Sequence, residues 1–139
     1  MKLVREVFEI ETKGEGDIID LTDRLRDLVR KSGVKEGLIN IFSIGSTCAI
    51  SNIEYEPGLK RDVFKILDRI APSNIHYNHN ERWGDYNGHS HVRATLIKPI
   101  YTAPIEDGDI LLGTWQQIVF IELDVKPRRR RIVVTIIGT

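Results

Sequence analysis

The chain has 139 residues, which is the length of one ordinary domain with a single core. Hydrophobic residues make up 41% and charged residues 29%, a balance that excludes both a disordered tail and a membrane protein. The 20 basic residues equal the 20 acidic residues, so no overall field draws the protein to nucleic acid or to anionic lipid. We therefore expect one domain over residues 1–139, with anion binding confined to local sites.

The sequence also indicates in which cellular compartment the protein is expected. No apolar stretch has the length of a membrane helix, and the first residues lack a signal-peptide core. The single cysteine, Cys48, cannot form an internal disulfide, so the fold does not depend on an oxidising compartment. These features predict a cytoplasmic protein with no membrane partner. We assign Cys48 no catalytic role, because a small buried hydrophobe is the simpler interpretation.

The first half of the chain combines strands with two amphipathic helices. Residues 2–12 alternate between two faces, as a half-buried strand does. Apolar residues recur at helical spacing over 18–28 and again over 59–70, and each stretch ends near a helix-terminating Gly or Pro. Between these helices, residues 38–44 and 48–55 are rich in Ile and Phe and are expected to form two strands.

The second half is predicted to be mostly β. Residues 72–88 keep no period, which predicts a long loop of functional character. Residues 91–98 alternate like a strand, 110–123 hold further strand material, and the apolar run over 130–137 predicts a strand buried on both faces. The expected fold is α+β, with mostly antiparallel, β-sandwich-like layers and two helices.

All four histidines lie between positions 76 and 91, and clustered histidine is a compositional indicator of metal binding. On an extended segment, His89 and His91 would project from one face with Cβ atoms about 6–7 Å apart. A catalytic zinc site uses three protein ligands and one open position, so we predict a divalent metal held by His79, His89 and His91, with His76 spare. The alternative is that all four are surface-loop histidines bonded to backbone or water.

Three polar residues are candidates for other roles at such a site. Arg93 would share a strand face with His91 and could hold a phosphate, with a structural ion pair as the alternative. Glu54 ends an otherwise neutral strand and could act as a general base, although an exposed carboxylate also fits. Asn87 could supply an oxygen ligand or fix a histidine tautomer, or it could simply form a turn.

The tract over 126–131, which holds Lys126, Pro127 and four arginines, is the one concentrated charge block. A turn that leads into a strand would divide such a run between two faces, which favours a solvated turn or ion pairs at a subunit interface. Nucleic acid is the least favoured partner, because a basic run alone is a weak indicator in a chain of zero net charge. The glycines form no phosphate-binding fingerprint, which argues against a P-loop enzyme.

Three segments resemble motifs of the YjbQ-like family, whose members are often described as secondary thiamine-phosphate synthases. They are Tyr-Asn-His-Asn at 77–80, Asn-Gly-His-Ser-His-Val-Arg-Ala at 87–94, and Gly-Thr-Trp-Gln-Gln at 113–117 followed by Glu-Leu-Asp at 122–124. Their order and spacing and the total length also match, so the resemblance covers nearly the whole chain.

The resemblance implies a compact α+β subunit that assembles as a homotrimer, with a metal or ligand site near the histidines and close to a subunit boundary. His79 and His91 match histidines typical of the family, and Glu54 matches the glutamate that ends its second motif. Trp115 and Gln116 belong to the family's Gly-Thr-Trp-Gln signature.

The chain departs from the family at one position. Many relatives have a histidine followed by hydroxyl residues before that glutamate, whereas this chain has Gly45 followed by Ser46 and Thr47. The departure implies a ligand set that has moved to His89, with Ser46 and Thr47 left as hydrogen-bond donors.

The activity that the resemblance implies is the joining of a pyrimidine diphosphate and a thiazole phosphate with release of pyrophosphate. Glu54 and His91 would be the catalytic residues. The residues that would bind this small phosphate-containing ligand are Ser46, Thr47, Asn87, Arg93, Trp115 and Gln116.

The sequence leaves undecided which metal would bind and whether the protein is an enzyme. A histidine set suits zinc or manganese, whereas displacement of pyrophosphate usually recruits magnesium. The alternative function is a non-catalytic trimeric module that binds a metal or a small anion. Because a shared fold does not establish a reaction, both hypotheses are carried forward.

Overall fold

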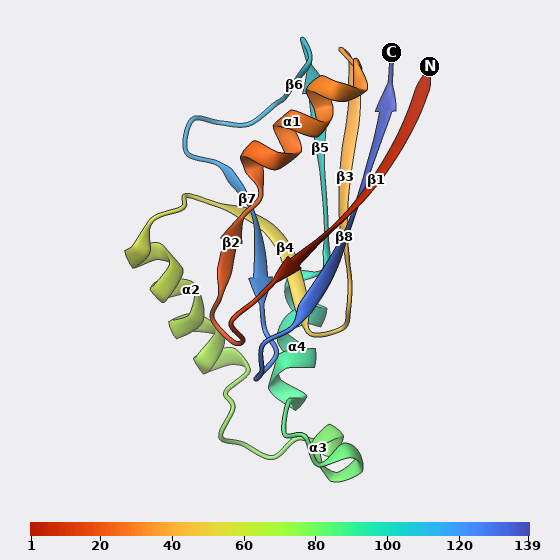
Figure 1. Cartoon of the computed structure of the whole chain (residues 1–139). Helices are drawn as coiled ribbons and strands as arrows, with labels where there is room; N and C mark the ends of the chain where they lie inside the picture. Colours follow the sequence, from red (N-terminus) through yellow and green to blue (C-terminus); the bar gives the residue numbers. More distant parts are fainter.

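Eight strands and four helices make up the computed structural model, which describes residues 1–139 (Figure 1). The two chain ends lie side by side at one end of the molecule, and α3 lies at the other end. None of the four helices is long and apolar enough to cross a membrane. The elements are β1 (Lys2–Glu11), β2 (Ile18–Asp20), α1 (Thr22–Ser32), β3 (Gly37–Ile44), β4 (Cys48–Ile53), α2 (Pro57–Ile70), α3 (Asn78–Trp83), α4 (Gly88–Ile97), β5 (Ile100–Glu106), β6 (Asp109–Ile110), β7 (Gln117–Glu122) and β8 (Arg129–Gly138).

The strands form two antiparallel sheets. The larger sheet has the order β1-β8-β3-β5-β6, and the smaller has the order β2-β7-β4. Strands β1 and β8 pair along their whole length, from Lys2 opposite Gly138 to Glu11 opposite Arg129. The ladder between β4 and β7 runs from Cys48 opposite Glu122 to Ile53 opposite Gln117. The α+β class and the antiparallel, layered sheets expected from the sequence are confirmed.

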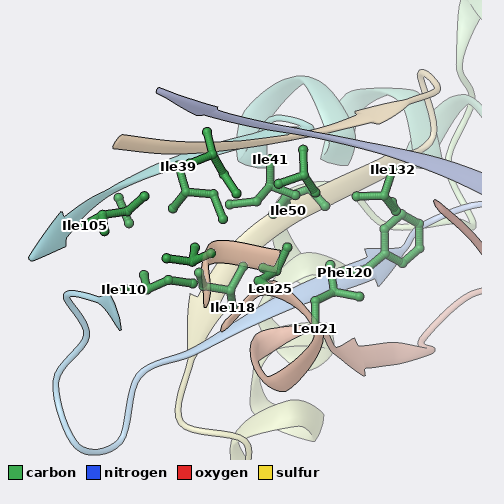
Figure 2. Close-up of a cluster of buried hydrophobic side chains, with 14 of the residues drawn as sticks. Leu21, Leu25, Ile39, Ile41, Ile50, Ile105, Ile110, Ile118, Phe120 and Ile132 are labelled. Atoms are coloured by element: carbon green, nitrogen blue, oxygen red, sulfur yellow. The ribbon is translucent and has the colours of Figure 1, made fainter. Parts of the chain in front are cut away.

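Two hydrophobic clusters place the smaller sheet in the middle of the molecule. Ile118 and Phe120 of β7 belong to the larger cluster, which β7 shares with the five-stranded sheet and α1. Val119 and Ile121 belong to the smaller cluster, which the sheet shares with α2 and α4. Strand β7 is therefore buried on both faces. Figure 2 shows the larger cluster, with side chains from α1 and from both sheets, among them Leu25, Ile41 and Phe120.

Helix α1 shows why a predicted helix forms. Leu25 and Val29 are fully buried and lie one helical turn apart, so one face of α1 packs into the core. Gly33 ends α1 in the left-handed region, with φ of 74°. The helix begins at Thr22, because the preceding residues 18–20 pair with β7 as the short strand β2. The predicted start at Ile18 is therefore wrong.

The structure has four helices where two were predicted. The residues predicted as a loop over 72–88 and a strand over 91–98 contain α3 and α4. The alternation was misleading because the buried face of α4 begins with His89, Ser90 and Arg93 before it reaches Ala94. A polar buried face gives no hydrophobic period, so packing against β4 decides the helix.

Two strands also differ from expectation. Strand β5 was missed, because Pro99 and Pro104 weaken its strand pattern. Strand β8 was predicted to be buried on both faces, but within one chain its burial alternates: Ile132, Val134 and Ile136 are buried. The other face of β8 carries Val133 and Ile137 beside the polar Arg129, Arg131 and Thr135, and it lies open.

Phe120 is the largest apolar side chain that is completely buried. We predict that Phe120→Ala lowers the free energy of unfolding by about 3–5 kcal/mol, because it removes apolar contacts and leaves a cavity. The matched control is Ile70→Ala, on an α2 side chain that is 59% exposed, which should cost less than about 1 kcal/mol. Urea denaturation of both variants measures the difference, and equal losses would contradict this description of the core.

Candidate functional site

Two histidine rings meet where α3 and α4 approach each other. The ring centroids of His79 and His91 are 4.3 Å apart, and the ring planes are inclined by 41°. His79 Nδ1 is buried and makes no hydrogen bond. The nearest carboxylate oxygen, Asp85 Oδ1, is 3.9 Å from it, which is too long for a hydrogen bond. The pair therefore contains one buried ring nitrogen, His79 Nδ1, that has no hydrogen-bond partner.

The surroundings of His91 favour its neutral form. Burial lowers the pKa of His91 below its ordinary value of 6.5, and the neighbouring His79 lowers it further. The carboxylates of Asp124 and Asp85 oppose this shift without reversing it. A neutral imidazole keeps a nitrogen lone pair that can accept a proton or bind a metal ion. His91 is therefore prepared for either role at neutral pH.

Asp124 is a fully buried carboxylate that organises this end of the site. It accepts hydrogen bonds from Asn87 Nδ2 (3.2 Å), Thr47 Oγ1 (3.1 Å), Arg128 Nε (2.8 Å) and the Val125 amide (2.8 Å). Burial acts to raise the pKa of Asp124, but the hydrogen bonds from Arg128, Val125 and Asn87 outweigh it and hold that pKa below 3.8. Asp124 is therefore a fixed anion. It positions Asn87, whose own Oδ1 is buried and unpartnered.

A second buried carboxylate, Glu122, supports Asp124 from behind. Its Oε2 is 2.5 Å from Arg130 Nη2, and its Oε1 accepts a hydrogen bond of 2.7 Å from Thr12 Oγ1. Arg130 Nη2 also donates to Thr47 Oγ1 at 2.9 Å. Arg130 was predicted to belong to a solvated turn or a subunit interface, and that prediction is wrong. Its guanidinium is buried within the chain because it neutralises Glu122.

The same guanidinium fills the space in front of Gly45. A Cβ atom at position 45 would lie 2.7 Å from Arg130 Nη1 and 3.1 Å from Cys48 Sγ, so any side chain there would displace Arg130. Burial raises the pKa of the Cys48 thiol, which packs in the larger core cluster. The absence of a histidine at position 45 and the buried Arg130 are therefore two parts of one arrangement.

His89 belongs to a different network. His89 and His91 are two positions apart on a helix, so they point to nearly opposite sides. His89 Nε2 is 2.6 Å from Glu15 Oε1. Arg93, one turn further on, is completely buried; it donates to Asp68 Oδ1 at 2.8 Å and to the Ala71 carbonyl at 3.0 Å. The contacts of Arg93 are those of the structural ion pair considered as its alternative.

The three predicted metal ligands therefore do not converge within one chain. The structure brings His79 and His91 together and keeps His89 in its own network with Glu15. No group of three or more His, Cys, Asp or Glu side chains in the chain is arranged to hold a metal ion. The chain supplies two adjacent imidazole ligands, and a metal held with His89 stays a prediction.

Glu54 and the signature residue Trp115 lie at the other end of the smaller sheet. Thr47 precedes β4 and Glu54 follows it, so at ~3.3 Å per residue the two lie about 20 Å apart. Glu54 and Trp115 line a cavity of about 430 Å³ with Asp20 and Tyr55. The predicted catalytic residues Glu54 and His91 thus do not meet within one chain.

Gln116 and Ser46, the remaining residues predicted to bind the substrate, lie at opposite ends of the smaller sheet. Gln116 is held by its own turn: its Oε1 accepts a hydrogen bond from the Gly113 amide and its Nε2 donates to Asn52 Oδ1. Ser46 is exposed beside the buried Thr47. Their roles in substrate binding stay predictions.

Sequence reasoning missed Glu122 and Asp124 as parts of the site. The available signal was the pattern of acidic residues at 122 and 124 followed by arginines at 128 and 130, after a fully apolar strand. Acidic residues that end a buried strand need partners, and a run of cations follows within a few positions, at 126 and 128–131.

Fold and site together define a class of single-domain α+β proteins in which a histidine pair lies beside a buried aspartate. Residues 6–139 match the family model described as "UPF0047 protein YjbQ-like". A UPF0047 protein of Methanothermobacter thermautotrophicus is 37% identical over 138 residues, which cover 99% of this chain and 94% of the relative. A UPF0047 protein of Methanocaldococcus jannaschii is 34% identical over 132 residues, which cover 94% and 92%. This chain belongs to the YjbQ-like family.

Solved structures agree with this assignment. A YbjQ-like protein of unknown function from Sulfolobus solfataricus P2 superimposes with a TM-score of 0.89 at 31% identity, covering 99% of this chain and all of the other. A hypothetical protein from Aeropyrum pernix K1 gives a TM-score of 0.89 at 26% identity, covering 98% and 99%. The family resemblance and the fold expected from the sequence are therefore confirmed.

The contact between the two histidines makes the titration of His91 depend on His79. We predict that NMR of the imidazole C–H signals finds the pKa of His91 below 6.5, and that His79→Asn raises it towards 6.5 by removing a repulsive neighbour. Because the folded-state pKa is lowered, the stability that neutral His91 contributes is present above pH 6.5 and is lost as the pH falls through the folded-state value. His76→Asn is the control and should leave the His91 titration unchanged. A His91 pKa that ignores His79 would contradict the pairing.

Proposed function

We propose that the protein is a small enzyme that acts on a phosphate-containing substrate beside His79 and His91. The observation that carries the proposal is the histidine pair itself, with ring centroids 4.3 Å apart and unpartnered buried atoms at His79 Nδ1 and Asn87 Oδ1. Buried polar atoms are almost always bonded in folded proteins, so two free ones beside a neutral imidazole favour a ligand site.

The donor set also fits a divalent metal as a partner of the pair. Two neutral imidazoles suit zinc or manganese better than magnesium, which prefers oxygen ligands. His79 and His91 would hold the ion, and a bound divalent ion there would supply positive charge for phosphate oxygens. The cations of the site itself are already committed, since Arg128 is paired with Asp124 and Arg130 with Glu122.

The reaction we propose is the one that the family resemblance implies. The ring nitrogen of a thiazole phosphate forms a bond to the methylene carbon of a pyrimidine diphosphate, while the carbon–oxygen bond to the diphosphate breaks. Pyrophosphate leaves with the bonding electron pair. His91 would donate a hydrogen bond from its neutral ring to the phosphate oxygen on which charge accumulates, and Asp124 would hold Asn87 in place beside it.

The second candidate is a non-catalytic module that binds a metal or a small anion. One observation favours it: Glu54, the predicted catalytic carboxylate, lies about 20 Å from the Thr47 end of β4 and therefore away from the histidine pair. Without a second catalytic group, an imidazole pair is sufficient for binding but supplies only part of an acid–base mechanism.

Metal analysis of the purified protein followed by an assay of the condensing reaction separates the two candidates. For the enzyme, His91→Ala should lower kcat by about 100-fold or more, since proton-transfer and hydrogen-bonding groups contribute on this order. His76→Ala is the matched control, because its exposed ring makes only a 3.6 Å contact with Glu81. Bound metal without turnover would favour the module, and turnover that survives His91→Ala would contradict a catalytic His91.

We also propose that the protein self-assembles through the open face of the five-stranded sheet, and the resemblance implies three copies. Residues opposite one another on this face form rows across the strands. One row joins Val7, Val133, Phe42 and Ile100, and a second joins Leu3, Ile137, Leu38 and Pro104. Seven of these eight side chains are aliphatic or aromatic, and a large exposed apolar patch usually marks an interface.

A polar row of side chains lies between the two apolar rows. It joins Arg5, Thr135, Asn40 and Thr102, in which Arg5 Nε donates to Thr135 Oγ1 and Asn40 Nδ2 donates to Thr102 Oγ1. A partner on this face would bury the second side of β8, whose sequence predicts burial on both faces. The proposed assembly therefore accounts for the pattern that one chain leaves open.

Light scattering tests the assembly. We predict that the protein has the mass of three chains and that Phe42→Asp, in the centre of the apolar row, reduces it to the mass of one, because an unpaired charge would be buried at the interface. Ile70→Asp places the same charge on an apolar residue of α2 that is 59% exposed, against 40% for Phe42, and should leave the mass unchanged. Loss of assembly in both variants, or in neither, would contradict this surface as the interface.

A further inference from the structure

The largest cavity of the molecule lies apart from the histidine pair. It has a volume of about 560 Å³, within the range of small-molecule sites, and it lies between the loop that follows β1 and the first turns of α2. That loop separates the cavity from the His89 network, because Glu15 contacts His89 while its neighbours Gly16 and Asp17 line the cavity. The lining of the cavity includes Lys13, Asp17, Tyr55, Lys60, Arg61 and Phe64.

The charges of this cavity are unbalanced. Lys13, Lys60 and Arg61 all line it, and none of them has a carboxylate within 4.0 Å. Asp17 is the one acidic residue of the lining, and its Oδ2 accepts a hydrogen bond from the Lys13 amide at 2.9 Å. Three cations against one anion give a local positive field in a chain of zero net charge.

Two of these cations lie near the N-terminal end of α2. Lys60 and Arg61 are the fourth and fifth residues of this helix, which begins at Pro57. The first turn of α2 contains no acidic residue, and the capping Glu56 accepts hydrogen bonds from the first amides. An anion bound over Lys60 and Arg61 would therefore meet two cations that no carboxylate of the first turn neutralises.

The walls of the cavity are fixed before any ligand arrives. The Tyr55 hydroxyl donates a hydrogen bond of 2.8 Å to the carbonyl of Ile18 in β2. This bond fixes the position of the Tyr55 ring at the cavity. Backbone hydrogen bonds tie both Gly16 and Asp17 to Glu122 at the end of β7. The Lys60 ammonium lies 4.0 Å from the centre of the Tyr55 ring. The ammonium therefore covers one face of the Tyr55 ring, and the other aromatic ring of the lining is that of Phe64.

We propose that this cavity is a second ligand site, for a small molecule that carries a phosphate monoester and a planar ring. The phosphate would bind Lys60 and Arg61, with Lys13 also in the lining, and the ring would lie against Phe64, next to the Tyr55 ring that Lys60 covers. None of these residues belongs to the histidine pair, although Tyr55 also lines the cavity beside Glu54.

Adenosine 5′-monophosphate is a probe with both features, and adenosine and inorganic phosphate each carry one. In an NMR titration of the assembled protein, the monophosphate should shift the amide signals of Gly16, Asp17 and Ile18, and it should bind at least about tenfold more tightly than adenosine or phosphate alone. No shift of these amides at about 10 mM monophosphate, or equal binding of adenosine, would overturn the proposal.

Variants localise the binding. Lys60→Ala and Arg61→Ala should each weaken the monophosphate by about tenfold, since each removes a charged contact. Lys65→Ala removes an exposed cation from the same helix outside the cavity and should have no effect. His91→Ala should also bind normally, so a failure of the enzyme proposal would not be mistaken for a failure of this one. Equal weakening by Lys65→Ala would show only general attraction to a basic surface and would overturn the proposal.

Discussion

The buried ion pair between Glu122 and Arg130 joins the two sheets, and the candidate site is built on it. Glu122 ends β7 in the smaller sheet and Arg130 begins β8 in the larger one, and the pair also engages Thr12 and Thr47. Two charges withdrawn from water are stable only when each finds complete compensation. The hydrogen bonds of the pair provide it, and they bring the ends of four strands to one place.

Asp124 extends the same arrangement towards the histidines. Thr47 accepts a hydrogen bond from Arg130 and donates one to Asp124, so the first carboxylate is linked to the second through one hydroxyl. Asp124 in turn holds Asn87 at the start of α4, the helix that carries His91. Because Arg130 occupies the space in front of Gly45, a side chain at position 45 would displace it, so this rigid support depends on the glycine.

How much could be predicted from the sequence depended on whether an element buries apolar or polar side chains. Helix α1 was predictable because Leu25 and Val29 repeat at helical spacing, and its end was marked by Gly33. Helix α4 was not, because its buried positions include His89 and Arg93, which pair with Glu15 and Asp68 far away in the sequence. The sequence placed His79, His89 and His91 at one site; the structure brings the rings of His79 and His91 together and keeps His89 apart. Asp124, which holds Asn87 at the start of the helix that carries His91, was missed as a site residue because it lies 33 positions beyond His91.

The buried polar atoms without partners show where one chain is incomplete. All five such side-chain atoms belong to residues 79–93, on α3, α4 and the turn between them. Each unsatisfied buried atom costs about 1–3 kcal/mol, so five in one short segment are a substantial local cost. The rest of the core is satisfied, with Glu122 and Asp124 fully bonded. This free-energy cost is confined to the segment that carries His79 and His91. Such a pattern is expected where a ligand completes the missing hydrogen bonds, because binding then recovers the free energy that the folded chain alone does not gain.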